Sequence, residues 1–284
     1  MKALLREAGI ESFYVHINAG DPAPEIIMEA PGPQFNHMIL CVPLDGDTIW
    51  LDNTITSTPL GYLGSGISGR TALIVKGSES RLVTTPAIGH EDVQNASRWT
   101  ISLDEHGNGN ATGTIRMKGD QFHRLAYYRK FLSEDRLRDT IADLIRLSDT
   151  ELKEWNLFQP DRDSRFIILN CSLDAKNQIR RMGKYNVFRS IYPQMPDLEI
   201  GTQKEYDLVI PYPVSVTDTL VYKTPFKDSY ISELPGTISE SSDFGEIRTE
   251  TRETPSGFCL TRQIIINAGR YGVQNYKQFL DFID

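Results

Sequence analysis

Residues 36–54, NHMILCVPLDGDTIWLDNT, decide the fold of the first part of the chain because they contain two β-type segments around a turn. Segments 36–42 and 48–52 are rich in apolar and β-branched residues, and Asp45-Gly46 between them is a strong hairpin signal. A tip of two residues (45–46) and a tip of four residues (44–47) give the same register. That register pairs Ile39 with Asp52 and Cys41 with Trp50.

The register also sorts the side chains of the hairpin into two faces. One face carries His37, Ile39, Cys41, Trp50 and Asp52, and the other carries Met38, Leu40, Val42, Ile49 and Leu51. His37 and Asp52 become diagonal neighbours, about 7 to 8 Å apart at the backbone and within reach of a side-chain hydrogen bond. A histidine oriented by a carboxylate is the base half of a nucleophilic triad. An ordinary surface pair is the more common result of such spacing, so the pattern leaves both interpretations open.

The cysteines do not supply a nucleophile for this histidine. Cys41 lies on the same face, but two strand steps place it roughly 13 Å from His37, whereas proton transfer needs about 3 Å. Cys171 and Cys259 lie in apolar, strand-like segments elsewhere and are expected to be structural.

Two other patterns in the sequence are typical of ligand sites but lack the context that such sites require. Gly64-Ser-Gly-Ile-Ser-Gly69 matches the dinucleotide-binding pattern, but a β-type segment at 71–75 follows it where the fingerprint requires a helix. The remaining histidines show no metal-ligand spacing. We therefore expect neither a cofactor nor a metal.

Residues 1–8 form a helix pattern that ends at Gly9 but has no N-terminal capping signal. We interpret this segment as the end of a longer helix. The alternative is a frayed two-turn helix at a true N-terminus.

The order of these elements resembles the second half of the transglutaminase-like superfamily. The resemblance rests on the helix ending Ala3-Leu-Leu-Arg-Glu-Ala-Gly-Ile10, the strand 13–17, and the motifs Phe35-Asn-His37 and Trp50-Leu-Asp52-Asn-Thr54. It covers residues 1 to about 86 and implies a papain-like α+β core with a Cys-His-Asp triad. His37 matches the histidine of the triad, Asp52 matches the aspartate, and Thr54 matches the residue that closes the aspartate motif.

The same resemblance implies that the nucleophile is missing from residues 1–284. The cysteine of the family stands at the N-terminus of the helix, which places it about seven residues before Met1. The expected protein is a C-terminal fragment of a cysteine protease or acyl transferase acting on polypeptide or peptide-like amides. It is expected to be inactive without the upstream remainder of the same protein.

Composition restricts the partners of the chain. Its 284 residues carry a net charge of −8, without a block of Lys and Arg, which argues against nucleic acid. No apolar run approaches the roughly 18 to 20 residues that span a bilayer, so no transmembrane segment is expected.

The rest of the chain differs in composition. Residues 1–90 hold 5 basic and 9 acidic side chains, and residues 91–284 hold 25 and 29. We expect two domains, a partial core at 1–88 and a mostly β-sandwich domain at 92–284. Two helices should interrupt the sandwich, one after Ser133 and one from Ser148, where Ser148 and Glu151 have capping-box spacing.

This second region is similar to β-sandwich domains of unknown function that flank such cores in exported bacterial proteins. That similarity implies a periplasmic or cell-surface location. The alternative to an enzyme is a noncatalytic scaffold of transglutaminase-like fold whose β-sandwich binds protein or glycan partners through aromatics such as Tyr127 and Tyr222.

Overall fold

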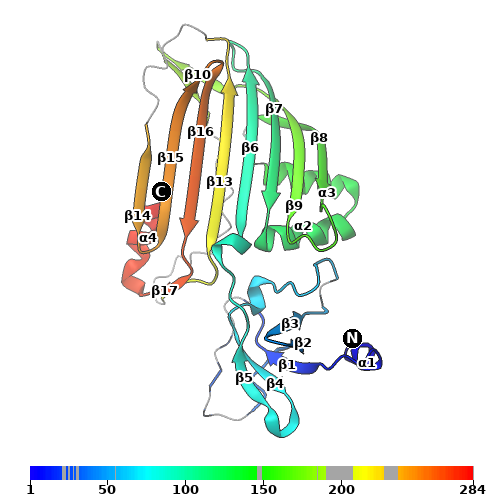
Figure 1. Cartoon of the computed structure of the whole chain (residues 1–284). Coiled ribbons are helices and arrows are strands. Elements are labelled where there is room, and N and C mark those ends of the chain that lie inside the picture. Colours follow the sequence, from blue (N-terminus) through cyan, green and yellow to red (C-terminus); the bar gives the residue numbers. More distant parts are fainter. Residues whose placement is uncertain are drawn as a thin grey trace.

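The structure of the protein is a computed structural model, which describes residues 1–20, 24, 26–27, 29, 32–54, 56–145, 149–183, 185–189, 207–226 and 236–283. Figure 1 shows a small sheet near the N-terminus and a much broader sheet built from the later strands. The expectation of an α+β fold that is mostly β is confirmed.

The small sheet is antiparallel and, over the described residues, has the strand order β3-β2-β1-β4-β5. Its strands are β1 (Phe13–Ile17), β2 (His37–Leu44), β3 (Asp47–Leu51), β4 (Thr71–Val75) and β5 (Arg81–Thr84). Helix α1 (Lys2–Glu7) precedes them and ends before Gly9, whose φ of +72° suits a glycine. One face packs apolar side chains such as Val15, Ile17 and Ile39 into a core. The sequence did not predict β5.

The broad sheet contains, within the described residues, eight strands in the order β14-β15-β16-β13-β6-β7-β9-β8. They are β6 (Gln94–Leu103), β7 (Gly109–Met117), β8 (Thr150–Phe158), β9 (Ile167–Ala175), β13 (Val214–Lys223), β14 (Ile238–Ser242), β15 (Gly245–Thr254) and β16 (Gly257–Ile266). Only the β13–β6 pair is parallel among these neighbours. The strands expected as a sandwich therefore lie in one wide sheet.

Within the described residues, two short strand pairs accompany this sheet. They are β10 (Ile179–Met182) with β11 (Tyr185–Phe188), and β12 (Leu208–Ile210) with β17 (Gly269–Tyr271). The short 3-10 turns are η1 (Ser65–Ile67), η2 (Gly77–Glu79), η3 (His90–Asp92) and η4 (Val273–Asn275).

Helices cover one face of the broad sheet. Helices α2 (Gly119–Phe131) and α3 (Glu134–Leu144) lie at the β9–β8 end, and α4 (Tyr276–Ile283) lies near β14 and β15 (Figure 1). Ser133 is the N-cap residue of α3, as predicted, although its hydroxyl makes no capping hydrogen bond. The sequence did not predict α2.

The predicted helix from Ser148 is wrong. Ser148 itself lies outside the described residues, and residues 150–158 form strand β8. Leu152 and Leu157 are buried while the polar residues between them are exposed, with a bulge between Leu152 and Glu154. Pairing with β9 therefore outweighed the local capping-box pattern.

Side-chain alternation gives the broad sheet one apolar and one polar face. Leu169, Leu173 and Ile101 on the covered face belong to a core that also contains Phe122 and Leu125 of α2. A second core, near α4, includes Phe244, Phe279 and Ile266.

The two sheets are joined by contacts between the loop after β3 and the start of α2. Tyr62 donates a hydrogen bond to the Gly119 carbonyl at 3.0 Å, and its ring meets Phe122 edge-on at 5.4 Å. The Ser65 hydroxyl donates to the Asp120 carboxylate at 2.7 and 2.9 Å. These contacts fix the small sheet against one end of the helical layer.

Candidate functional site

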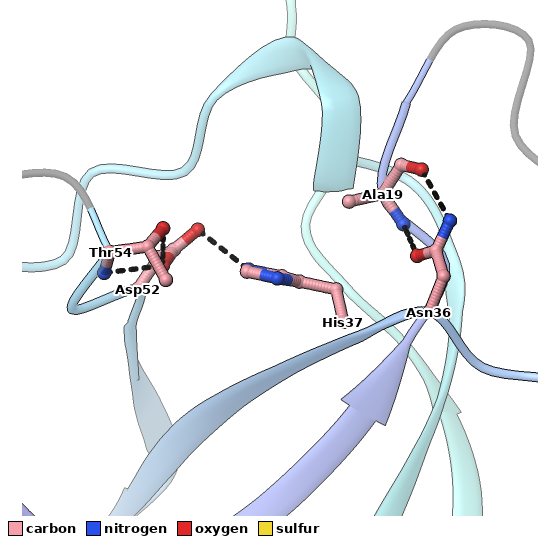
Figure 2. Close-up of polar contacts among 5 residues, drawn as sticks. All are labelled: Ala19, Asn36, His37, Asp52 and Thr54. Carbon is pink, nitrogen blue, oxygen red and sulfur yellow. Dashed lines mark hydrogen bonds and ion pairs between the residues drawn. The ribbon is translucent and has the colours of Figure 1, made fainter.

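His37 and Asp52 meet at one end of the small sheet. His37 begins β2 and Asp52 directly follows β3, so the two side chains come from neighbouring strands. His37 Nε2 lies 3.0 Å from Asp52 Oδ2, and the side chains are 21% and 7% exposed (Figure 2). The hairpin register predicts that these two side chains are neighbours, and in the structure they are in hydrogen-bond contact.

The hairpin register is the predicted one. Cys41 pairs with Trp50 and Leu40 with Leu51, and the turn is at Asp45-Gly46. His37 and Asp52 consequently project from the same face of the sheet.

Thr54 holds the other oxygen of the aspartate. Its backbone N–H donates to Asp52 Oδ1 at 3.0 Å and its hydroxyl donates to the same atom at 2.7 Å (Figure 2). Burial raises the pKa of Asp52, but the hydrogen bonds from Thr54 and His37 outweigh it, so the net pKa lies below the usual value. The carboxylate is therefore ionised and fixed in orientation at neutral pH.

Asn36 fixes the backbone immediately before His37. Its side chain accepts a hydrogen bond from Ala19 N–H at 2.7 Å and donates one to the Ala19 carbonyl at 2.9 Å (Figure 2). Asn36 N–H donates to Asn18 Oδ1 at 3.0 Å. These bonds continue the β1–β2 ladder beyond its last pair, Ile17 with His37, through side-chain amides. The sequence included Asn36 in the motif Phe35-Asn-His37 without assigning it a role, and it did not mark Asn18.

His37 Nε2 is in hydrogen-bond contact with Asp52. The second ring nitrogen of the histidine, Nδ1, is therefore the one that can contact a reacting group. Among the described residues, no hydrogen-bond partner of His37 Nδ1 is found. An imidazole held by a carboxylate on one nitrogen, with its second nitrogen available, can take up and return a proton.

The cysteines of the chain are unsuited to pair with this histidine. Cys41, Cys171 and Cys259 are all buried and free of disulfides. Burial raises the pKa of the Cys41 thiol, and it raises the pKa of Cys171 to about 11. A catalytic thiol needs the opposite shift.

Other possible ligand sites from the sequence do not gather into a site. The glycine-rich segment 64–69 forms the short turn η1 and leads into β4, without a following helix. In the described ranges, no cluster of three or more His, Cys, Asp or Glu side chains has metal-binding geometry.

Tyr222 is 2% exposed and unavailable to a partner, whereas Tyr127 is 48% exposed. No helix within the described ranges is both long and apolar enough to cross a bilayer.

A cleft that the sequence did not indicate lies beside β3. Its volume is about 460 Å³, and its lining includes four consecutive residues of β3, Asp47 to Trp50. The opposite side is formed by the loop 60–63, residues 86–88, Lys118 and Arg165. The cleft reaches Trp50, two residues before Asp52. Its walls come from distant parts of the chain, which explains why no sequence motif marked it.

No protein-family model and no curated protein matches the chain. A crystal structure of a putative protease from Parabacteroides distasonis ATCC 8503 aligns with 99% of this chain at 11% identity and a TM-score of 0.47. The chain spans 39% of the length of that protein.

Proposed function

We propose that His37 and Asp52 are the general base and the orienting carboxylate of a cysteine-dependent acyl-transfer site that acts on polypeptide amides. The observation that carries the proposal is the 3.0 Å contact between His37 Nε2 and the ionised Asp52, with Nδ1 of the imidazole left for a reacting group. The transglutaminase-like resemblance of residues 1 to about 86, and the papain-like core that it implies for domain 1–88, belong to this proposal. Residues 92–284 are the appended β domain.

The proposed reaction divides amide cleavage into two steps. A thiolate attacks the amide carbonyl, a C–S bond forms, and His37 delivers a proton to the departing amine as the C–N bond breaks. His37 then removes a proton from water or from an acceptor amine, which attacks the thioester and releases the thiol. Asp52 stabilises the imidazolium that is present before His37 gives its proton to the departing amine, and again after His37 has taken a proton from the water or the acceptor amine.

In this proposal the thiol is none of the three buried cysteines of residues 1–284. The family resemblance assigns it to polypeptide preceding Met1. Such a thiol, held against His37, should have a lowered pKa and react rapidly with alkylating reagents near neutral pH.

The test is alkylation of the full-length gene product that contains this sequence. Iodoacetamide labelling is followed by mass spectrometry as a function of pH, in the wild type and in His37→Ala. We expect one cysteine to react at a pH well below the ordinary thiol range, and this reactivity to shift to higher pH in His37→Ala.

His16→Ala provides the matched control, because His16 lies on the neighbouring strand β1 and contacts Phe35. It should leave the labelling profile unchanged. The proposal fails if no upstream cysteine shows a lowered pKa, or if His37→Ala leaves the reactive cysteine unaffected.

A second candidate function is favoured by the uncovered face of the broad sheet. A depression of about 490 Å³ there is lined by polar side chains of four adjacent strands, including Arg98, Thr114, Asn156 and Asn170. Such a surface could hold a polar polymer such as a glycan. Saturable binding of the whole chain on a glycan array, lost in Arg98→Ala, would support it, and binding that is absent or unchanged in Arg98→Ala would reject it.

A further inference from the structure

The cleft beside β3 follows the free edge of the small sheet. Among the described residues that line it, four are consecutive in β3 and none belongs to the neighbouring strand β2. A depression over a face of the sheet would include both strands. Because β3 is the last strand in the order β3-β2-β1-β4-β5, the cleft must lie along its unpaired side.

The backbone of β3 presents hydrogen-bonding groups to this cleft. The two-residue turn makes Leu44 and Asp47 a hydrogen-bonded pair, and in an antiparallel ladder such pairs alternate. Ile49 is therefore bonded to Val42, whereas the N–H and C=O groups of Thr48 and Trp50 point away from β2. The Thr48 N–H is satisfied by Asp47 Oδ1 at 2.7 Å.

The outward groups of Trp50 have no such partner. Within the described part of the chain, no backbone hydrogen bond from another segment reaches Trp50. An unpaired strand edge of this kind is a template for an additional strand.

The opposite wall of the cleft offers space and apolar contact without a dominant charge. Leu60 is 67% exposed, and Pro86 and Ala87 are also exposed. Lys118 and Arg165 are balanced by Asp47 and Asp92 in the same lining. The chemistry is therefore suited to a main chain with apolar side chains more than to a charged small molecule.

We propose that the β3 edge cleft binds an extended polypeptide by strand addition. The four β3 residues along the cleft correspond to roughly 13 Å of strand, or about four residues of a bound peptide. A peptide that continues past Trp50 approaches Asp52 and His37. As an assignment of substrate class, the strand-addition proposal rests on the proposed function. The substrate that it specifies is an extended, unfolded polypeptide segment that is recognised through its main chain.

The test measures peptide binding by residues 1–284 independently of any reaction. The probe is a fluorescein-labelled heptapeptide of alternating valine and threonine with a lysine at each end. Its matched control has the same side chains with alternate peptide nitrogens methylated, which removes the donors that pair with a strand edge. We expect saturable fluorescence anisotropy with the first peptide and at least a tenfold weaker affinity with the second.

Hydrogen exchange identifies the edge that is used. Bound peptide should slow exchange of the outward Trp50 amide, while the Ile49 amide, already paired with Val42, should change little. Ala87→Trp, which fills the cleft, should weaken binding at least tenfold. Leu82→Trp, on the other edge strand β5, should leave the affinity unchanged.

Equal affinity for the methylated peptide, absence of saturable binding, or protection at another strand edge would overturn the proposal. His37→Ala separates this outcome from the fate of the proposed function. It should retain peptide binding, because His37 is not part of the β3 edge. Saturable peptide binding without a reactive upstream cysteine in the full-length protein would overturn the proposed function alone. A reactive cysteine that depends on His37, without saturable peptide binding, would overturn the strand-addition proposal alone.

Discussion

Asp52 is the residue on which the candidate site depends. Its two oxygens have different partners, since Oδ1 accepts two hydrogen bonds from Thr54 and Oδ2 faces His37. Fixing one oxygen leaves the other in a single orientation toward the imidazole. Thr54 thus positions His37 through the Asp52 carboxylate, without itself contacting the imidazole.

Thr54→Val should raise the pKa of Asp52 toward its usual value, because the hydroxyl donor to Oδ1 is lost. In the wild type the lowered pKa means that ionised Asp52 stabilises the fold above the unfolded-state pKa of about 3.9. This stabilisation is lost as the pH falls through the folded-state pKa. The variant should therefore lose about 1 kcal/mol of unfolding free energy at neutral pH and less in acid.

Urea denaturation at several pH values, with a carbon-13 NMR titration of the Asp52 carboxyl, measures both effects. Thr54→Ser keeps the hydroxyl and should behave as the wild type. A loss of stability that is constant from pH 7 to pH 3, with an unchanged Asp52 pKa, would contradict this account.

At the scale of elements, the end of the β1–β2 ladder is closed by side chains. Asn36→Ala removes both hydrogen bonds to the Ala19 backbone. We expect a loss of about 1–2 kcal/mol in unfolding free energy, since water can replace part of the pairing at this partly exposed position. The Ala19 amide should exchange roughly tenfold faster.

Asn36→Asp is the matched variant for this prediction. It keeps the acceptor for Ala19 N–H but places a carboxylate oxygen where the amide donated to the Ala19 carbonyl. The Ala19 amide should therefore exchange more slowly than in Asn36→Ala, whereas the unfolding free energy should not recover to the wild-type value. Unchanged exchange at Ala19 in Asn36→Ala would show that the side-chain pairing does not hold this end of the strand.

Strand pairing in the broad sheet depends on a glycine opposite a tryptophan. Gly113 pairs with Trp99, and a Cβ at Gly113 would lie 2.5 Å from the Trp99 ring. Trp99 is 3% exposed and cannot swing into solvent. Gly113→Ala should cost about 1–3 kcal/mol through overpacking, measured by urea denaturation.

Thr112→Ala, on the exposed face of the same strand, is the control and should change stability by less than about 0.5 kcal/mol. Trp99→Phe should reduce the cost of the alanine, because the smaller ring frees space. If the two substitutions have strictly additive effects, the proposed steric conflict is absent.

At the scale of the whole molecule, the sequence predicted the features that depend on residues close together in the chain. The turn at Asp45-Gly46 and the alternation around it fixed the hairpin register, and with it the contact of His37 with Asp52. Strand β8 was mistaken for a helix because its apolar spacing suits either structure until β9 is placed beside it. The edge cleft is formed by residues as distant as Asp47 and Arg165, which only the tertiary structure brings together.

The coupling of the two sheets is predicted to depend on Tyr62. Burial raises the pKa of its phenol, whose O–H donates to Gly119, and its ring packs on Phe122, which is fully buried among the residues of the broad-sheet core. Tyr62→Ala removes a link between two otherwise separate cores. We expect scanning calorimetry to change from one transition to two, with a loss of about 3 kcal/mol or more in the less stable part.

Tyr62→Phe keeps the ring contact and removes only the hydrogen bond, so it should retain one transition and lose about 1 kcal/mol. A single transition in Tyr62→Ala, with a loss no larger than that of Tyr62→Phe, would mean that Ser65–Asp120 and the remaining contacts suffice to couple the sheets. Two transitions would instead show that cooperativity passes through one aromatic contact. In that case the wall of the edge cleft that Tyr62 lines would be positioned by the same contact, and peptide binding at β3 should weaken together with the coupling.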